Sequence, residues 1–551
     1  MALRTHLTAV GRGVRSALAR RLFVDRRALV ALRVALGSLL LADLLLRARS
    51  LAFFYTDVGA LPRSMLFTRY PITATLSVHA WFGDLWWVAL LFVAAGIAAL
   101  ALALGYRTKV AAICSLVLLV SLHARNPLVL NGGDSLLRRT LLWSLFLPLG
   151  SGLVLDDQTR SRHPAAVALL IQPVVLYLVN AVIKLRGDAW PSGRAVQMVF
   201  SIDSLTVLLG EEIAAYPGLL AGLGAAWVVL LCCSPLLVLT TGPRRTAVVA
   251  AFAAAHTGMA FTLGVGLFPL VSLAALLPYL PPAVWESTER RWNRGVRTTG
   301  SVLTAGTGWV VRTIRAVKPG WTPGGTPTGR TMQAGKRLAR GRSAIVRAEI
   351  VALGSALSAL GRAAPGWVTA DDRRGEERSL GSVDRAWIAA AVGRTGRGVA
   401  TALLLVVVLW NGAALGYVDA PEVGAIEVSP EETRWDMFAP SPPTQDVWYV
   451  AVGTLESGEE VDVIHGGEPS LQRSDRRWSS YPSARWRKYL EVVRWNGDDT
   501  LRGRFVSALC TRWNTGHRTR IETLTVHELS RPTRSNGTEP VQERRVRTYS
   551  C

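Results

Sequence analysis

The residue whose type and position most clearly suit it for catalysis is Lys184, near the end of an apolar run. Only five of the 62 basic residues are lysines. Unlike a guanidinium, an amine held away from water can lose its proton and act as a base. Tyr177, Asn180 and Lys184 are spaced by three and four residues, as on one face of a helix. We therefore predict Lys184 as a catalytic base, with Tyr177 and Asn180 as substrate-binding neighbours. The alternative is a lysine that extends to the lipid headgroups.

A second polar group opens the apolar run near residue 134. Asn131-Gly-Gly-Asp134 is a turn sequence that leads into a helix, and Arg138 follows four residues after Asp134. Asp134 can cap that helix and can pair with Arg138 on its surface. The functional hypothesis is a cavity wall in which Asn131, Asp134 and Arg138 bind an anion or a polar headgroup. The alternative is helix capping combined with anchoring at the membrane interface.

Two histidines lie in apolar runs. His256 is in the middle of one run, and His123 ends another, beside Arg125. Polar groups inside a membrane are costly and tend to be functional. We predict His256 as a second catalytic candidate and His123 as a substrate-binding residue. The alternative for each is a packing residue that hydrogen-bonds between helices.

The composition places these residues in a membrane protein. Of the 551 residues, 50% are hydrophobic and 18% are charged, whereas soluble domains carry about 25% charge. The net charge is +23. In a membrane protein, basic loops hold the cytoplasmic side against anionic lipid, so we predict no nucleic-acid partner. The sequence has no metal-ligand spacing and no nucleotide-binding, zinc-protease or serine-hydrolase motif.

Apolar runs predict nine membrane spans, because a spanning helix needs about 20 mostly apolar residues. The predicted spans are 28–46, 85–104, 108–123, 134–154, 164–185, 216–240, 245–262, 264–281 and 398–417. The runs within 245–281 form either two spans or one broken helix. The arginine-rich start predicts a cytoplasmic N-terminus in the cell membrane, and an odd number of spans places the C-terminus outside. The predicted fold class is mainly α: a polytopic helical bundle with a C-terminal extracytoplasmic β-rich domain.

These spans divide the chain into five predicted parts. They are a basic cytoplasmic N-terminus (1–27), a membrane domain (28–281), a basic cytoplasmic insert (282–397), a final transmembrane helix (398–417) and an outer domain (418–551). Within the insert, Met332–Ala363 is either an amphipathic helix on the inner leaflet or a solvated linker.

The outer domain has the alternation of β-strands at Val447–Thr454 and Thr523–Glu528. We expect it to pack near the loop 186–215, which the predicted topology places on the same side of the membrane. Cys510 and Cys551 fall in this domain and can pair if it faces an oxidising compartment.

Several runs together resemble the HTTM domain, the membrane domain shared with vitamin K-dependent γ-carboxylase. One is His123-Ala-Arg-Asn-Pro127, followed by Asn131-Gly-Gly-Asp134 and Leu-Leu-Arg138. Another is Tyr177-Leu-Val-Asn180-Ala-Val-Ile-Lys184-Leu, continuing to Asp188-Ala-Trp190. Thr262-Leu-Gly-Val-Gly-Leu-Phe-Pro269 and the tail motif Trp435-Asp-Met-Phe-Ala-Pro440 with Trp448-Tyr449 complete the set. The resemblance covers about residues 20–285 and the tail.

The resemblance implies a role for Lys184. In the carboxylase, a lysine deprotonates reduced vitamin K, oxygenation of the quinol gives a strong base, and CO₂ adds to a protein glutamate after removal of its γ-proton. Lys184 is the matching position, so the resemblance implies a reduced, vitamin K-like quinone as cofactor and a secreted peptide as substrate. The carboxylase also uses a histidine in the segment that resembles 131–136, where this chain reads Asn-Gly-Gly-Asp. The tail is smaller than the carboxylase's propeptide-binding region.

Two classes of function remain open from the sequence. The first is a membrane enzyme that modifies a quinol or a peptide, with Lys184 as its base. The second is a non-enzymatic membrane scaffold or maturation partner for secreted peptides. The expected partners are the lipid bilayer, a quinone or lipid ligand and a secreted peptide. A transporter is a weaker hypothesis, because nothing suggests two inverted halves. The feature that discriminates between the first two is whether Lys184 lies in a closed apolar pocket.

Overall fold

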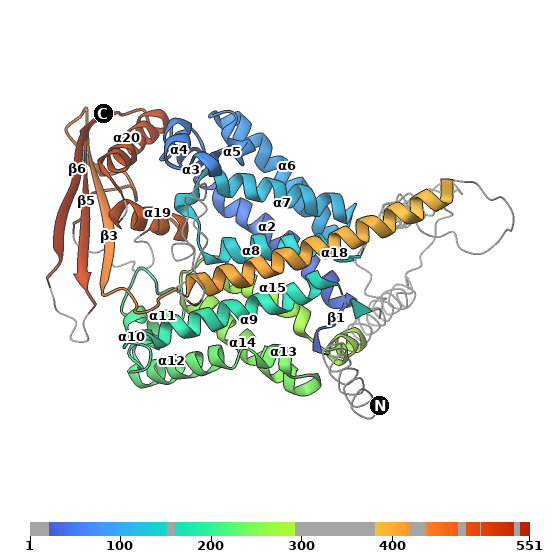
Figure 1. Ribbon diagram of the computed structural model, residues 1–551. Coiled ribbons are helices and arrows are strands. Elements are labelled where there is room, and N and C mark those ends of the chain that lie inside the picture. The colour runs from blue at the N-terminus through green and yellow to red at the C-terminus, as the bar shows by residue number, and fades with distance from the viewer. Residues whose placement is uncertain are drawn as a thin grey trace, which may run out of the picture. The chain divides into compact units, whose positions relative to one another are not determined.

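The computed structural model describes residues 21–150, 160–161, 163–291, 381–415, 417, 437–471, 481–495, 497–533 and 540–551. The chain divides into two compact units, Met1–Trp285 with Ala391–Cys551, and Glu286–Ala390. The first unit contains the helical bundle and the C-terminal sheet (Figure 1). Most of the second unit, including the segment Met332–Ala363, lies outside the described residues.

Five helices in the described part are long and apolar enough to cross a membrane. They are α2 (Arg26–Ala48), α6 (Leu85–Leu104), α7 (Thr108–Arg125), α9 (Pro164–Leu185) and Thr395–Ala413 within α18 (Gly381–Ala414). A sixth span results if Phe268–Tyr279 and Pro282–Arg291 count as one broken span. These helices match five of the predicted spans, and α6 has the predicted bounds. The chain is therefore built as a membrane protein, with fewer long spans than the nine expected.

Of the four remaining predicted spans, three are short or interrupted and one forms a helix with two arginines near its start. They contain α8 (Gly132–Ser144), α12 (Pro217–Cys232) with α13 (Leu236–Leu239), α14 (Gly242–Thr262), and α15 (Phe268–Leu276) with η3 (Leu277–Tyr279). The helix α14 has sufficient length, at 21 residues, but its first turns carry Arg244 and Arg245. Gly266 adopts a φ of 68°, which a helix cannot contain, so α14 and α15 are two helices and not one broken one.

Short elements order the connections between the long helices. They are α3 (Leu51–Tyr55), α4 (Arg63–Arg69), α5 (Pro71–Thr75), η1 (Val78–Ala80), η2 (Pro127–Val129), α10 (Ala195–Phe200) and α11 (Gly210–Ala214). Two short strands, β1 (Val24–Asp25) and β2 (Arg160–Ser161), pair antiparallel. The connections between the long helices thus contain several short helices.

The C-terminal domain contains a four-stranded antiparallel sheet in the order β4-β3-β5-β6. The strands are β3 (Gln445–Leu455), β4 (Glu460–Asp462), β5 (Ile521–Pro532) and β6 (Gln542–Ser550). The predicted strands Val447–Thr454 and Thr523–Glu528 are confirmed: they lie in β3 and β5, which pair along their lengths.

Two helices that the β-rich prediction missed, α19 (Ala484–Trp495) and α20 (Asp499–Gly516), lie between the sheet and the bundle (Figure 1). The buried residues of α19 recur with helical spacing, at Trp486, Tyr489, Leu490 and Val493. Asp498 caps α20 by accepting a hydrogen bond from the amide of Leu501. The domain is therefore a mixed α and β fold.

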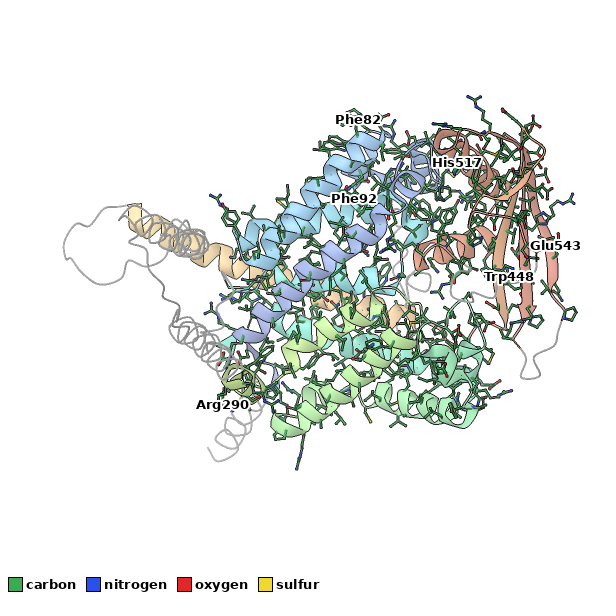
Figure 2. The ribbon with its side chains drawn as sticks, turned by 180° about the vertical axis from the view of Figure 1, so that it is seen from behind. Phe82, Phe92, Arg290, Trp448, His517 and Glu543 are labelled. Atoms are coloured by element: carbon green, nitrogen blue, oxygen red, sulfur yellow. A yellow bond between two sulfur atoms is a disulfide. The ribbon has the colours of Figure 1, made fainter. Side chains whose placement is uncertain are left out.

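The outer domain shares its hydrophobic core with the segment that follows α2. Phe53 of α3 stacks on Trp486 of α19, with ring centroids 4.3 Å apart. Phe505 of α20 and Phe92 of α6 belong to the same buried cluster. Figure 2 shows Phe92 on the bundle and Trp448 on the sheet. Because one core includes residues of both parts, the outer domain is packed onto the bundle and is not a separate globule.

The outer domain also contacts the segment 186–215, as expected. Ser204 Oγ donates to Asp446 at 2.9 Å, and Arg531 pairs with Asp203 at 3.2 Å. Two polar contacts from different strands therefore fix the sheet beside this segment.

The structure pairs Cys510 of α20 with Cys551 in a disulfide that joins residues 41 apart. Closing a loop of this size restricts the unfolded chain and stabilises the fold by about 2–4 kcal/mol. We therefore expect the double variant Cys510→Ser/Cys551→Ser to unfold at lower denaturant concentration, with earlier hydrogen exchange in β6. Cys114→Ser, which replaces an exposed free thiol, is the control. Equal unfolding of the double variant and the control would show that this disulfide does not stabilise the domain.

Candidate functional site

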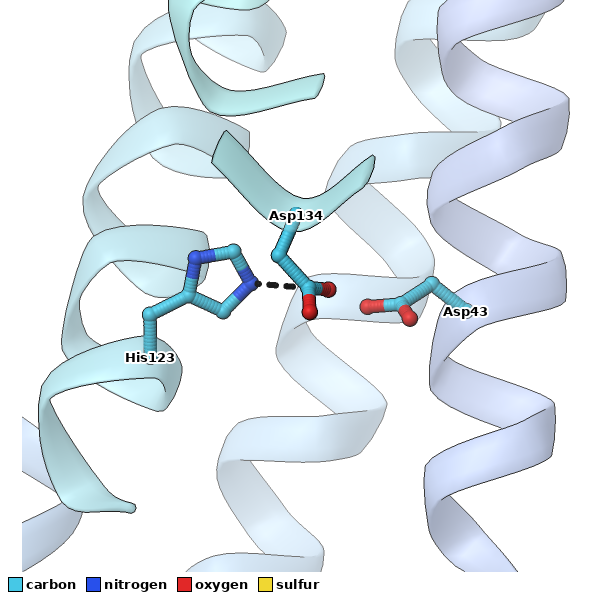
Figure 3. A group of neighbouring side chains, drawn as sticks. All are labelled: Asp43, His123 and Asp134. Carbon is cyan, nitrogen blue, oxygen red and sulfur yellow. Dashed lines mark ion pairs between the residues drawn. The ribbon is translucent and has the colours of Figure 1, made fainter. Parts of the chain in front are cut away.

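A buried network of ionisable side chains lies where α2, α7, α8 and α19 meet. Its members are Asp43, Arg47, His123, Asp134, Arg138 and Arg485. Figure 3 shows Asp43, His123 and Asp134 pointing toward one another from three helices. The sequence predicted His123, Asp134 and Arg138 as site residues, and the structure brings these three together.

Arg47 is the centre of this network and is almost fully buried. It follows Asp43 by one helical turn, and its Nε donates to that carboxylate at 2.7 Å. Its two Nη atoms donate to Asp134 at 2.7 Å and to the Tyr55 hydroxyl at 2.7 Å. His123 Nε2 lies 3.1 Å from the same guanidinium. Planar, multidentate donation of this kind is what a guanidinium provides and an ammonium cannot.

Arg485 brings the outer domain into the same network. It donates to both oxygens of Asp134, at 3.0 and 3.1 Å, to the carbonyl of Val129 at 3.1 Å, and to Asp43. Burial and the nearby Arg47 oppose its charge, but Asp134 and Asp43 outweigh them and raise the pKa of Arg485. Two carboxylates therefore face two guanidiniums, and the centre of the network is charge-balanced.

The geometry of Asp43, His123 and Asp134 would also suit a metal ion, because each offers a ligand atom within 4.8 Å of the others. The donor set argues against this use. Both carboxylates already accept hydrogen bonds from Arg47 and Arg485. The two ring nitrogens of His123 face guanidinium groups as well. A metal cation would have to displace an arginine, so the arrangement suits ion pairing better than metal binding.

The start of α8 differs from the expectation in two details. Asn131 is the capping residue, and Asp134 is the third helical residue of a capping box: its carboxylate accepts from the Asn131 amide at 2.8 Å. Arg138 contacts His123 Nδ1 at 3.3 Å, whereas the ion-pair partners of Asp134 are Arg47 and Arg485. The pairing of Asp134 with Arg138 is not formed, because arginines from two other helices already take up the carboxylate oxygens.

Lys184 is buried, with 1% of its surface exposed, so it does not extend to headgroups. Its Nζ donates to the carbonyl of Met437 at 2.7 Å and lies 3.7 Å from the centre of the Trp190 ring. Met437 begins a segment, Met437–Pro440, that we call the strap. The Trp190 indole donates to the Phe438 carbonyl at 2.7 Å, and a side chain at Gly187 would collide with Pro440. A carbonyl oxygen and an aromatic face are both common partners of a lysine side chain.

Tyr177 and His256 form a separate pair between α9 and α14. The Tyr177 hydroxyl lies 2.8 Å from His256 Nε2, and Phe252 stacks on the Tyr177 ring at 4.5 Å. His256 is fully buried, and its Nδ1 has no hydrogen-bond partner in the described part of the chain. Along α9, Tyr177 lies about 10 Å from Lys184, and Asn180 is buried between them.

The predicted residues therefore form three groups and do not line one cavity. Lys184 lies under the strap, Tyr177 contacts His256, and Asp134 with Arg138 and His123 belongs to the network around Arg47. Tyr177 and Lys184 lie on the same face of α9 but two helical turns apart, so they have different neighbours. For this reason their spacing predicted too compact a site.

A cavity of about 730 Å³ lies between the bundle and the outer domain. Asn131, a predicted substrate-binding residue, lines it together with Phe268 of α15 and Arg487 of α19. Met437 and Phe438 of the strap form part of its wall, whereas Lys184 does not line it. The strap thus contacts Lys184 and also forms a wall of the cavity.

Three central residues of the network were missed in the sequence. Asp43 and Arg47 are charges at the end of an apolar span, four residues apart, and this signal was available. Arg485 lies among many arginines of the tail, and nothing in its local sequence marks it.

No family model, curated protein or solved structure matches this chain. The resemblance to the HTTM domain therefore depends on the sequence motifs alone.

The network predicts strong coupling between Asp134 and Arg485. Removing one partner leaves a buried charge unpaired, so we expect Asp134→Asn and Arg485→Gln each to lower the free energy of unfolding by about 3–5 kcal/mol. The double variant should lose clearly less than the sum, because neither charge is then left alone. Arg502→Gln, in an exposed pair of α20, should cost less than about 1 kcal/mol. Denaturant unfolding in detergent measures all four variants, and additive losses would contradict the coupling.

Proposed function

We propose that this chain is a multi-pass protein of the cell membrane in which Lys184 is the functional lysine of a carboxylase-like, quinol- or peptide-modifying enzyme. The observation that carries the proposal is the burial of Lys184 at the end of a membrane helix. A lysine with only an anchoring role would be expected to reach water at this position. Instead, the outer domain reaches over the helix end and covers it through the strap.

The proposed topology places the N-terminus inside and the outer domain outside. The basic segments predicted to face the cytoplasm support the first half. The disulfide Cys510–Cys551 supports the second, because such bonds persist mainly in oxidising compartments. With this orientation Lys184 lies toward the outer face of the membrane.

In the described arrangement, Lys184 is held as a hydrogen-bond donor. Its Nζ donates to the carbonyl of Met437 and faces the ring of Trp190. Catalysis by a neutral amine therefore requires that the strap leave the lysine.

A reduced quinone, the cofactor implied by the resemblance, does not fit beside Lys184 while the strap is in place. Lys184 Nζ already donates to the carbonyl of Met437, which occupies the position that a quinol hydroxyl would need beside the amine. The cavity of about 730 Å³ does not reach the lysine. The chemistry proposed for this chain is therefore that of Lys184 and of the strap that covers it.

A non-enzymatic scaffold for secreted peptides is the second candidate. The ion-pair network favours it, because Arg485 fixes the outer domain to Asp43 and Asp134 by several charge-assisted hydrogen bonds. A domain held in this way can present a stable outer surface without any chemical step.

Substitutions at Lys184 separate the two candidates. Lys184→Arg keeps the charge and the stacking on Trp190 but removes the base, so we expect at least a ~100-fold loss of activity with normal membrane insertion. The assay is incorporation of labelled CO₂ into a glutamate-containing peptide, with reduced vitamin K and the full chain in vesicles. Lys109→Arg, at the start of α7, is the control. No turnover by wild type would favour the scaffold, and equal turnover by wild type and Lys184→Arg would exclude Lys184 as the base.

The orientation is tested by labelling single cysteines in intact cells. We expect Ser457→Cys, in the turn between β3 and β4, to react with an impermeant maleimide from outside. Tyr106→Cys, between α6 and α7, should react only after permeabilisation. Cys114, Cys232 and Cys233 are replaced by serine to remove the free thiols. Labelling of both positions from the same side would contradict the topology.

A further inference from the structure

We propose that the cavity between the bundle and α19 binds an anionic amphiphile, with its apolar chain against the bundle and its anionic group at Arg487. The cavity is a site distinct from Lys184, which does not line it. The inference therefore stands whether or not Lys184 is a catalytic base.

The bundle side of the cavity is apolar. Ile202, Leu205, Val265 and Phe268 line it, and Phe438 of the strap continues the same surface. Four of these side chains are almost fully buried, at 3–7% exposure, and so form a fixed wall. The volume of about 730 Å³ is within the range of roughly 300–1,000 Å³ that small-molecule pockets have. This wall can accept a hydrocarbon chain but offers nothing to a small inorganic anion.

The opposite side, formed largely by α19, is basic. It contributes Arg487, Lys488 and Arg494 and one carboxylate, Glu491. Arg487, Glu491 and Arg494 are spaced by four and three residues and therefore share a helical face. The N-terminus of α8, at Gly132 and Gly133, also borders the cavity. The lining thus carries more positive than negative charge.

Arg487 is the cation most available to a ligand. Arg494 already pairs with Glu528 at 3.2 Å, and Lys488 pairs with Glu491 at 3.5 Å. Arg487 donates to the carbonyl of Gly264 at 3.3 Å, and no carboxylate of the described residues pairs with it. A half-buried guanidinium next to an apolar wall recognises a carboxylate or a phosphate that carries a hydrocarbon chain.

Binding is tested with the full chain in a neutral maltoside detergent. The probe is 11-(dansylamino)undecanoic acid, whose fluorescence rises in apolar surroundings. We expect saturable binding, displaced by laurate and not by dodecanol. Arg487→Gln should weaken it at least ~10-fold, because a hydrogen bond to a charged group contributes about 1.5–3 kcal/mol. Arg502→Gln, in an exposed pair on α20, should bind like wild type.

A second variant guards against a folding defect in the first. Ala484 lines the cavity, and Ala484→Phe should reduce probe binding by filling it, with helical circular dichroism unchanged. Equal competition by dodecanol and laurate, absence of saturable binding, or Arg487→Gln binding like Arg502→Gln would overturn the proposal.

Native mass spectrometry of the protein extracted from membranes identifies the source of the ligand. A retained anionic phospholipid or a retained fatty acid, lost in Arg487→Gln, would each support the site and would distinguish a bilayer lipid from a free amphiphile. Equal retention of anionic amphiphiles by wild type and Arg487→Gln would contradict it.

Discussion

The ion pairs between Arg485 and the aspartates of α2 and α8 are the interaction on which the rest of the structure depends. Asp43, Asp134, Arg47 and Arg485 are buried together, and their opposite charges balance. A buried charge without its partner costs several kcal/mol. The helix α19 therefore cannot leave the bundle without leaving two buried carboxylates to the single guanidinium of Arg47. Electrostatics adds to the aromatic core around Phe53 in determining where the outer domain lies.

Both candidate sites follow from this placement of α19. Its first turn holds Arg485 in the network, and the residues that follow, including Arg487, form the basic side of the cavity. The strap precedes β3, whose sheet is fixed beside the segment 186–215 through Asp446 and Ser204. One fixed domain thus supplies the strap that covers the lysine and that also forms part of the cavity wall.

The sequence predicts the parts of this arrangement that depend on local pattern. The apolar runs of α6 and α9 are continuous, and the predicted bounds of both helices are confirmed. The helices of the outer domain were missed because their many arginines obscure the apolar spacing. The partner of Lys184 could not be predicted at all, since Met437 lies 253 residues away along the chain. The spacing of Tyr177 and Lys184 predicts that they share one face of a helix, but it does not predict which segment covers that face.

The strap and the ion pairs of Arg485 differ in the free energy needed to break them, and this difference indicates which part can move to uncover Lys184. The strap is held at the helix end by hydrogen bonds from Lys184 to the carbonyl of Met437 and from Trp190 to that of Phe438, and by the apolar packing of Ala439 on α9. Such a bond contributes about 0.5–1.5 kcal/mol, or up to roughly 3 kcal/mol when the donor is charged. Lifting the whole domain would in addition break the buried pairs of Arg485, at several kcal/mol. Exposure of the lysine by local movement of the strap is therefore the less costly route, and it leaves the network, the shared core and the basic wall of the cavity in place.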